Sequence, residues 1–477
     1  MLTVLLIIVP VLAGFISFFI KNERSVKSWA LLSSVATLAV SLISIFQNNN
    51  LITCDAAWLP MMGSRFTVSL DGMGKMLTLL TAVSFPVIFA STYNNHYKNP
   101  NAFYGFMLLT QAGLMGVFCA MDLLLFYFFW ELALIPAYFL CSKWGGEKRI
   151  PVTFKFFIYT FIGSLLMLIG ILFVYYKTPD HSFAITSLHN LTLTRGEENL
   201  AFWLFFIAFA IKMPVFPFHT WQPDTYEQAP TAVTMVLSAV MVKMGVFAVI
   251  RWLLPMFPNA SVRMADIVII LAVTGMIYAS LIAIRQDDIK RLIAYSSIAH
   301  IGLMAASMFT GSATGLQGVI FQMFAHGVNI IGLWIVADII EQQLGTRKFS
   351  ELGGLAQKAP ALAILFVIMA LANIALPLTN SFVGEFLMFY SVFNYNLILG
   401  AAAVISIILA AVYTLWMVQK IFYGEVRDND YVGLKLPANT RVMLMILAAV
   451  VLIFGVYPQP MINLTSDTVT KILAQIK

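Results

Sequence analysis

The sequence predicts an all-α membrane protein, and two observations support that prediction. Of the 477 residues, 60% are hydrophobic and only 10% are charged, and a soluble fold could not hide so much apolar surface from water. Apolar runs of about 18 residues or more recur along almost the whole chain, and each could cross a hydrocarbon core of about 30 Å as a helix. These runs lack the alternation of barrel strands, so the expected spanning elements are helices.

We expect about fourteen transmembrane helices, with ends defined to within a few residues. The first run has no basic region before it and no small-residue cleavage site after it, so we interpret it as a retained helix and not as a cleaved signal peptide. In chain order, the expected spans are 2–20, 28–46, 73–94, 102–120, 122–142, 153–176, 200–218, 230–251, 266–285, 291–310, 314–340, 361–394, 398–423 and 440–458.

Basic residues are divided unequally between the two sets of loops. Loops after odd-numbered spans carry seventeen lysines and arginines, whereas loops after even-numbered spans, together with the C-terminal tail, carry seven. The positive-inside rule therefore predicts that both termini lie outside the cytoplasm or its organellar equivalent. Of the 28 basic residues, four remain outside these loops. Lys75 and Lys155 sit near span ends, where their side chains can reach the membrane interface. Lys212 and Lys243 fall inside spans.

Several classes of site are not indicated by the sequence. Cys54, Cys119 and Cys141 are scattered without pairing or metal-ligand spacing, which is typical of small core residues and not of a disulfide framework or an iron–sulfur cluster. There is no glycine-rich nucleotide turn and no basic stripe that would indicate nucleic acid. We therefore expect this chain to bind no cofactor and no metal.

Ionisable side chains occur inside the expected spans. They are Glu131, Lys212, Lys243, His300, His326, Asp338 and Glu385. Such groups are costly in hydrocarbon, and each indicates a functional site by default. Together they are the inventory of a proton relay. The structural alternatives are an ion pair for Glu131 with Lys212 and a neutral hydrogen-bonded histidine for either imidazole. Asp338 lies near its helix end and close to Glu341, so an interfacial, structural role is favoured for it over a functional one.

Two of the expected spans are interrupted by proline. The stretch AFAIKMPVFPFHTW places Pro214 and Pro217 directly after Lys212, and LANIALPLTNSFVGEFLMFY places Pro377 before Glu385. Proline inside a span frees carbonyl groups and opens the helix, and such broken helices line wet cavities in transporters. The breaks fall in spans seven and twelve. The two breaks are therefore five spans apart. A repeat unit with an odd number of spans enters the membrane from the opposite side the second time, so a five-span unit would recur in inverted orientation.

This spacing predicts two inverted repeats and a four-part chain. The prediction depends on hydropathy and on the positions of the breaks, because residue identity between the halves is weak. The parts are an N-terminal three-helix region at 1–101, a first inverted repeat of spans 4–8 at 102–251, a second of spans 9–13 at 252–423, and span 14 with a tail at 424–477.

Three segments together resemble one known family, the antiporter-like subunits of respiratory complex I. They are KMPVFPFHTWQPDTYEQAPTAVTMVLSAVMVKMG, DDIKRLIAYSSIAHIGLM and FQMFAHGVNIIGLWIVADIIEQQLGTRKFSELGGL, and the likeness runs from about 103 to 422. Complex I chains L and N and the large subunits of multisubunit cation/proton antiporters share much of this pattern. Those sister branches typically carry lysine at the broken twelfth helix, whereas the chain M branch carries glutamate, as this sequence does at Glu385.

The resemblance implies roles for individual residues. Glu131 looks like the fifth-span glutamate that pairs with the seventh-span lysine, which is Lys212 here. Lys243 looks like the central eighth-span lysine that connects two proton sites. Glu385 is similar to the twelfth-span group that hands protons to the far side.

Further positions match the family, with one departure. His300 and His326 match polar residues of the central hydrophilic axis. Family members often read proline, aspartate, alanine, histidine where this chain has Pro-Asp-Thr-Tyr at 223–226, so the resemblance does not support a proton path through that histidine. His219 and Asp224 lie at the loop-side end of the seventh span, where they could guide proton entry or cap helices.

The resemblance implies a proton-translocating membrane subunit of NADH:quinone oxidoreductase that performs no redox chemistry itself. Its implied partners are chains L and N, the small membrane chains, the lipid bilayer and, indirectly, the peripheral NADH-oxidising arm, whose subunits carry FMN and iron–sulfur clusters. The implied location is an energy-transducing membrane such as the bacterial inner membrane. The alternatives are a subunit of a cation/proton antiporter, and a scaffold whose buried charges only fix helix packing. The resemblance places the quinone site in other subunits.

Overall fold

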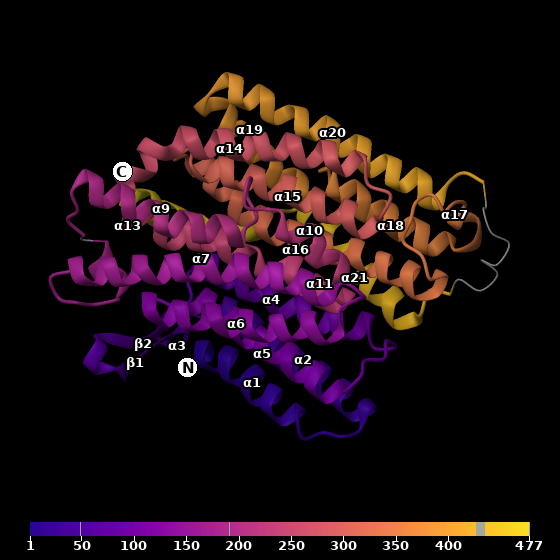
Figure 1. Cartoon of the computed structure of the whole chain (residues 1–477), viewed down its shortest axis with the longest axis horizontal. Coiled ribbons are helices and arrows are strands. Elements are labelled where there is room, and N and C mark those ends of the chain that lie inside the picture. The colour runs from indigo at the N-terminus through magenta and orange to yellow at the C-terminus, as the bar shows by residue number, and fades with distance from the viewer. Residues whose placement is uncertain (48, 190, 426–434, 477) are drawn as a thin grey trace.

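A computed structural model describes every residue except 48, 190, 426–434 and 477, so two of the counted basic residues, Arg427 and Lys477, lie outside it. The described chain is a bundle of long helices with one small hairpin (Figure 1). Its elements are α1 (Leu2–Ser17), α2 (Glu23–Ile45), α3 (Asn49–Ile52), β1 (Thr53–Leu59), η1 (Pro60–Met62), β2 (Ser64–Ser69), α4 (Gly72–Ser91), α5 (Pro100–Cys119), α6 (Leu123–Trp144), α7 (Arg149–Lys177), α8 (Ile185–Leu188), α9 (Arg195–Lys212), α10 (Trp221–Gln228), α11 (Thr231–Val236), η2 (Leu237–Met241), α12 (Lys243–Ala248), η3 (Val249–Leu253), α13 (Leu254–Met256), α14 (Pro258–Ile284), α15 (Ile289–Met308), α16 (Ala313–Leu344), α17 (Leu355–Lys358), α18 (Pro360–Asn373), α19 (Asn380–Tyr395), α20 (Leu397–Phe422), α21 (Ala438–Val456) and α22 (Gln459–Ile476).

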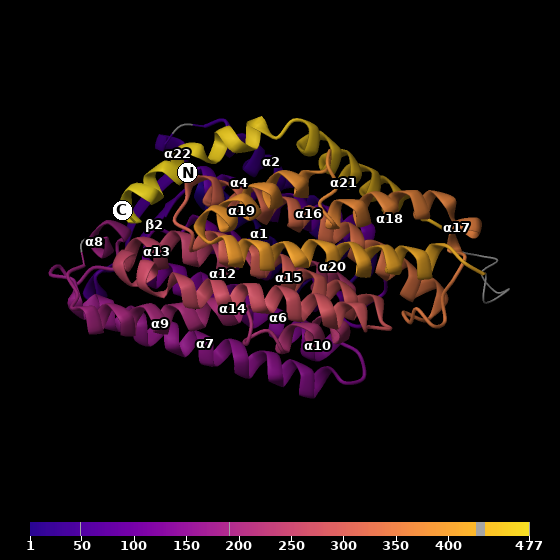
Figure 2. The same ribbon diagram turned by 90° about the horizontal axis from the view of Figure 1, so that it is seen from above.

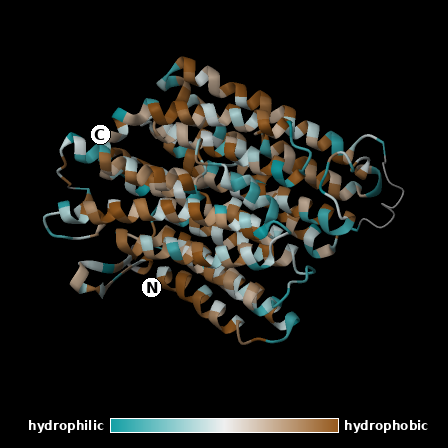
Figure 3. Cartoon of the chain, viewed as in Figure 1, coloured by the Kyte–Doolittle hydropathy of each residue, from teal (hydrophilic) through white to brown (hydrophobic). Residues whose placement is uncertain are grey.

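Ten membrane-crossing helices, by length and composition, are found in the described part of the chain, and α1 and α18 are shorter apolar helices. Helix α9 is not among the ten because its 18 residues include Arg195, Glu197, Glu198 and Lys212. Hydrophobic residues cover most of the long helices (Figure 3). The predicted all-helical membrane fold is confirmed, while the count of fourteen spans and the inverted repeats stay predictions.

Polar side chains determine where several of these helices begin. The Asp71 carboxylate accepts a hydrogen bond from Gly74 N at the start of α4, and Asp122 accepts from two backbone N–H groups at the start of α6. Asp288 and Ser312 cap α15 and α16 in the same way. Each cap satisfies backbone donors that the first helical turn leaves unpaired.

A β-hairpin and a C-terminal helix were not predicted from the sequence. Strands β1 and β2 pair antiparallel between α2 and α4, through a turn in which Gly63 has φ 68°. The segment after α21 forms α22, which packs against α4 and α16 and is joined to α4 by a 2.9 Å hydrogen bond from Gly72 N to Thr468 Oγ1. Figure 2 shows α22 and α21 along one side of the bundle. The expected C-terminal tail is therefore a packed helix.

The loops gather at two ends of the bundle. At one end, which we call the basic face, a cavity is lined by residues of the loops that follow α4, α6, α10, α14 and α16. These loops follow odd-numbered expected spans, the set that carries the excess of basic residues. The hairpin and both ends of the described chain lie at the opposite end, on the left in Figure 1.

Candidate functional site

Both helix breaks expected from the prolines are present. Helix α9 ends at Lys212, and regular helix resumes only with α10 at Trp221. Helix α18 ends at Asn373, and α19 begins at Asn380. Each break therefore lies next to an ionisable residue inside the bundle, because Lys212 ends one helix and Glu385 sits in the second turn of another.

Helix α16 packs closely against the second break. Its Asn329 Nδ2 donates to Ser381 Oγ at 2.6 Å and to the Ala372 carbonyl at 3.4 Å. A Cβ atom built on Gly384 would lie 2.5 Å from Gln322 Oε1, so only glycine permits this approach of α19 to α16. The close approach lets Gln322 Nε2 donate to Glu385 Oε1 at 3.2 Å.

Four ionisable residues form a continuous buried row, which we call the polar axis: Lys243, His326, His300 and Glu385. Lys243, which is 0% exposed, donates from Nζ to the Ser238 carbonyl at 2.7 Å and lies 2.8 Å from His326 Nδ1. The two imidazole centroids are 5.3 Å apart. His300 Nδ1 lies 2.9 Å from Glu385 Oε1. Four helical segments, α12, α15, α16 and α19, thus contribute one residue each to the axis.

The two histidines have matching free atoms. Nε2 of His300 and Nε2 of His326 are both buried without a protein hydrogen-bond partner. Buried polar atoms are rarely unpaired, and where they are, ordered water commonly supplies the partner. Each imidazole therefore has one nitrogen held by a protein group and one free to bind water.

A small cavity lies beside the end of the axis. It holds about 20 Å³, and its walls include His300, Glu385 and Tyr413 of α20. This volume suits about one water molecule. The Tyr413 hydroxyl is buried without a protein partner. Sequence reasoning identified neither Tyr413 nor Gln322, because neither residue is charged and neither lies beside a helix break.

Glu131 and Lys212 do not form the direct ion pair that the resemblance implied. No ion pair within 4 Å joins them in the described chain, and Lys212 Nζ lies 5.5 Å from the centroid of the Trp130 ring. Adjacent residues on a helix project about 100° apart. The side of α6 that faces Lys212 is therefore occupied by Trp130, and Glu131 lies next to Ser164 of α7.

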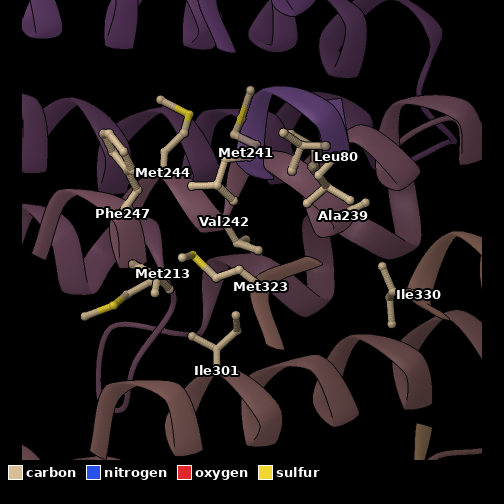
Figure 4. Close-up of a cluster of buried hydrophobic side chains, with 14 of the residues drawn as sticks. Leu80, Met213, Ala239, Met241, Val242, Met244, Phe247, Ile301, Met323 and Ile330 are labelled. Carbon is tan, nitrogen blue, oxygen red and sulfur yellow. The ribbon is translucent and has the colours of Figure 1, made fainter. Parts of the chain in front are cut away.

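Apolar side chains surround the two lysines. Met213 and Val242, their sequence neighbours, gather with Met323 and Ile301 in one buried cluster (Figure 4). No hydrogen bond or ion pair among the described residues connects Lys212 with Lys243. Glu131 and Lys212 thus form a first charged group that is separate from the polar axis.

His219 and Asp224 lie outside the axis. Asp224 accepts from Lys155 at 2.8 Å and from Arg291 at 3.1 Å, so it belongs to an ion-pair network at the basic face. His219 is buried and stacks on Phe216, with Nδ1 unpaired. In the same network, burial raises the pKa of the Asp288 carboxyl above its ordinary value, partly offset by the neighbouring Arg347 guanidinium.

Gly245 sets the distance between α12 and the first break. A Cβ atom there would lie 2.7 Å from the Phe209 carbonyl and 2.8 Å from Met213 N. We expect Gly245→Val to destabilise the protein by about 1–3 kcal/mol through overpacking, and to reduce the amount of assembled protein on native gels. Gly196→Val is the matched control, because a Cβ at Gly196 meets nothing within 4 Å. Equal assembly of both variants would contradict this account of the packing.

This chain is similar to known proteins in family, sequence and structure. The family described as NADH:quinone oxidoreductase/Mrp antiporter, TM matches residues 120–410. NADH-quinone oxidoreductase subunit M of Rhodobacter capsulatus is 37% identical over 468 residues, which cover 94% of this chain and 91% of the relative. The subunit M of Escherichia coli K12 is 35% identical over 98% of this chain and 96% of its own.

A solved structure agrees with these relatives. A chain of respiratory complex I from Thermus thermophilus superposes with a TM-score of 0.92 at 28% identity and covers 100% of both chains. The described residues contain no cluster of three or more His, Cys, Asp or Glu that could hold a metal ion. The chain belongs to the NADH:quinone oxidoreductase/Mrp antiporter transmembrane family, and within it to the NADH-quinone oxidoreductase subunits M.

Proposed function

We propose that this chain translocates protons across the membrane as a non-redox subunit of an NADH:quinone oxidoreductase. The observation that carries the proposal is the polar axis, a buried row of groups that bind and release protons. Oxidation of NADH and reduction of quinone take place in partner subunits that carry FMN and iron–sulfur clusters. Chains L and N and the small membrane chains are its neighbours in the complex.

The contacts of the axis support a stepwise transfer. A proton leaves Lys243 Nζ for His326 Nδ1, which is 2.8 Å away, while His326 releases its Nε2 proton to water. That water protonates His300 at Nε2, and His300 passes its Nδ1 proton to Glu385 Oε1 at 2.9 Å. Each histidine binds one proton as it loses another, and the row returns to its starting state when Lys243 takes up a new proton and Glu385 releases its own.

The position of the basic face indicates the direction of proton movement across the membrane. The positive-inside rule places this face in the cytoplasm of a bacterial cell and both termini on the other side of the membrane. Protons then enter from the basic face, pass along the axis and leave beyond Glu385. The first charged group, Glu131 and Lys212, responds to neighbouring subunits, because a change in charge there alters the proton affinity of the axis.

A subunit of a cation/proton antiporter is the competing proposal. An Mrp complex chain from Dietzia has the same fold, with a TM-score of 0.86 at 21% identity, but this chain covers only 55% of it. At that identity the likeness concerns the fold alone. Glu385 on the broken helix favours the redox complex.

Affinity purification distinguishes the two proposals. A tag on this chain, followed by gentle solubilisation of the membranes, is expected to recover a complex that contains FMN and iron–sulfur clusters and reduces quinone with NADH. Flavin fluorescence, electron paramagnetic resonance and NADH oxidation provide the measurements, and untagged membranes provide the control. A complex free of flavin and without NADH oxidation would instead support the antiporter.

A further inference from the structure

The cavity at the basic face has polar walls. It holds about 750 Å³ and is walled by residues from five loops and the helix ends beside them. Its charged walls include Glu227, Asp288, Lys290, Asp338 and Glu341. A cavity of this size and polarity holds many water molecules, so protons at the basic face have access to these walls.

Asp338 differs from the other acidic groups of this wall. Glu341 is paired with Lys290 at 2.6 Å, Asp288 with Arg347 at 2.9 Å, and Glu227 with Arg291 at 2.7 Å. Asp338 has no ion pair within 4 Å in the described chain. It accepts instead from the neutral amide of Asn95 at 3.0 Å, and it is 6% exposed. Asp338 can therefore gain and lose a proton without breaking an ion pair.

Helix α16 continues from Asp338 to the axis. Asp338 lies one turn deeper in the bundle than Glu341, Trp334 follows one turn further on the same side of the helix, and His326 lies two more turns along α16. Asp338 and His326 are separated by about 18 Å along the helix, at about 1.5 Å per residue. A proton at Asp338 therefore needs intermediate polar groups to reach the Lys243–His326 contact.

Such groups lie between the two. The Tyr226 hydroxyl, the Trp334 Nε1 group and both polar atoms of Gln222 are fully buried and have no protein partner. The Tyr226 and Trp334 rings are 6.0 Å apart. So many unpaired polar atoms in one region are unusual in a protein interior unless water is bound there.

Hydroxyl groups of the neighbouring helix continue the row. Thr234 Oγ1 donates to the Tyr226 carbonyl at 3.3 Å, and Ser238 Oγ donates to the Thr234 carbonyl at 2.8 Å. Lys243 Nζ in turn donates to the Ser238 carbonyl. Polar groups thus extend from the cavity wall to the first residue of the axis.

We propose that Asp338 is the proton-uptake group of this chain, and that Tyr226 and bound water carry protons from it to Lys243. Asp338 takes a proton from cavity water onto a carboxylate oxygen and releases it inward to water. Tyr226 relays it by donating its hydroxyl proton as its oxygen accepts the next one. This inference rests on the proposed function. The proposal gives a role to Tyr226, which stands where family members often have histidine. It also replaces the structural role that the sequence favoured for Asp338 with a functional one.

The test uses the assembled complex in inverted membrane vesicles. Asp338→Asn keeps the shape of the side chain but removes the proton site, so we expect NADH-driven proton pumping to fall about tenfold or more. Asp338→Glu is expected to restore most of it. Tyr226→Phe, which removes only a hydroxyl, is expected to lower pumping by a smaller factor. Asp467→Asn is the matched control, since Asp467 is 76% exposed beside Lys471.

Access to the cavity is tested separately by thiol labelling. A charged, membrane-impermeant thiol reagent is expected to modify Asp338→Cys in inverted vesicles, but not Ile335→Cys, whose position is 1% exposed and is not part of the cavity wall. Normal pumping by Asp338→Asn, failure of glutamate to restore it, or an unreactive Asp338→Cys would each overturn the proposal. If Asp338→Asn pumps normally but Lys243→Met does not, only the uptake group is wrong. If both pump normally, the proposed function fails.

Discussion

Replacing Lys243 with methionine is expected to lower coupled NADH:quinone oxidoreductase activity by about tenfold or more, because it interrupts the polar axis at its first residue. Methionine has nearly the length of lysine and suits a site that is 0% exposed, so helix packing is retained. The Ser238 carbonyl and His326 Nδ1 lose their shared partner, which costs about 1–3 kcal/mol of stability.

This expectation is measured as quinone reduction by NADH in coupled membranes. Oxidation of NADH by a water-soluble artificial acceptor reports on the partner subunits and is expected to be unchanged. Lys471→Met is the matched control, because Lys471 is 73% exposed in a surface ion pair with Asp467. If Lys243→Met membranes reduce quinone as fast as the control, Lys243 is a packing residue.

Glu131→Gln and Lys212→Met are each expected to remove coupled quinone reduction and proton pumping with little loss of assembly. Lys212 is 2% exposed, and neither its Nζ atom nor Glu131 Oε1 has a protein partner. Removing either charge breaks no ion pair within 4 Å in the described chain, and the lost contact between Lys212 and Trp130 contributes only about 1 kcal/mol. Assembly is therefore expected to depend little on these two side chains.

Native gels and pumping in inverted vesicles provide the measurement for this pair. Glu425→Gln, an exposed glutamate, serves as the matched control for the carboxylate. Loss of assembly in proportion to loss of pumping would show that the two charges hold helices together, which is the structural alternative.

Much of the architecture could be predicted because hydrocarbon restricts what a chain can do. Long apolar runs have to be helices. The chain is broken at the prolines that follow Lys212 and precede Glu385, whereas Pro10, Pro86 and Pro136 lie inside continuous helices. The hairpin between α2 and α4 escaped prediction because its strands are short and largely exposed, without a buried face to set a hydrophobic alternation.

The contacts of the axis could not be predicted in the same way. Lys243 and His326 lie 83 residues apart in the chain and meet only because α12 and α16 pack together. Glu131 forms no ion pair with Lys212, because Trp130 of α6 lies against Lys212, and a family pattern does not specify this packing. The position of Asp338 near a helix end favoured a structural role for it. In the structure the surrounding loops bury this helix end beside a cavity, and such burial depends on tertiary packing that the sequence does not specify.

The most direct test of the account is the rate of NADH-driven acidification in inverted vesicles that contain the Lys243→Met complex, compared with Lys471→Met at equal amounts of assembled complex. The account predicts that acidification is lost in the first and unchanged in the second. Acidification at the wild-type rate by an assembled Lys243→Met complex would contradict the claim that protons cross the membrane along the row from Lys243 to Glu385.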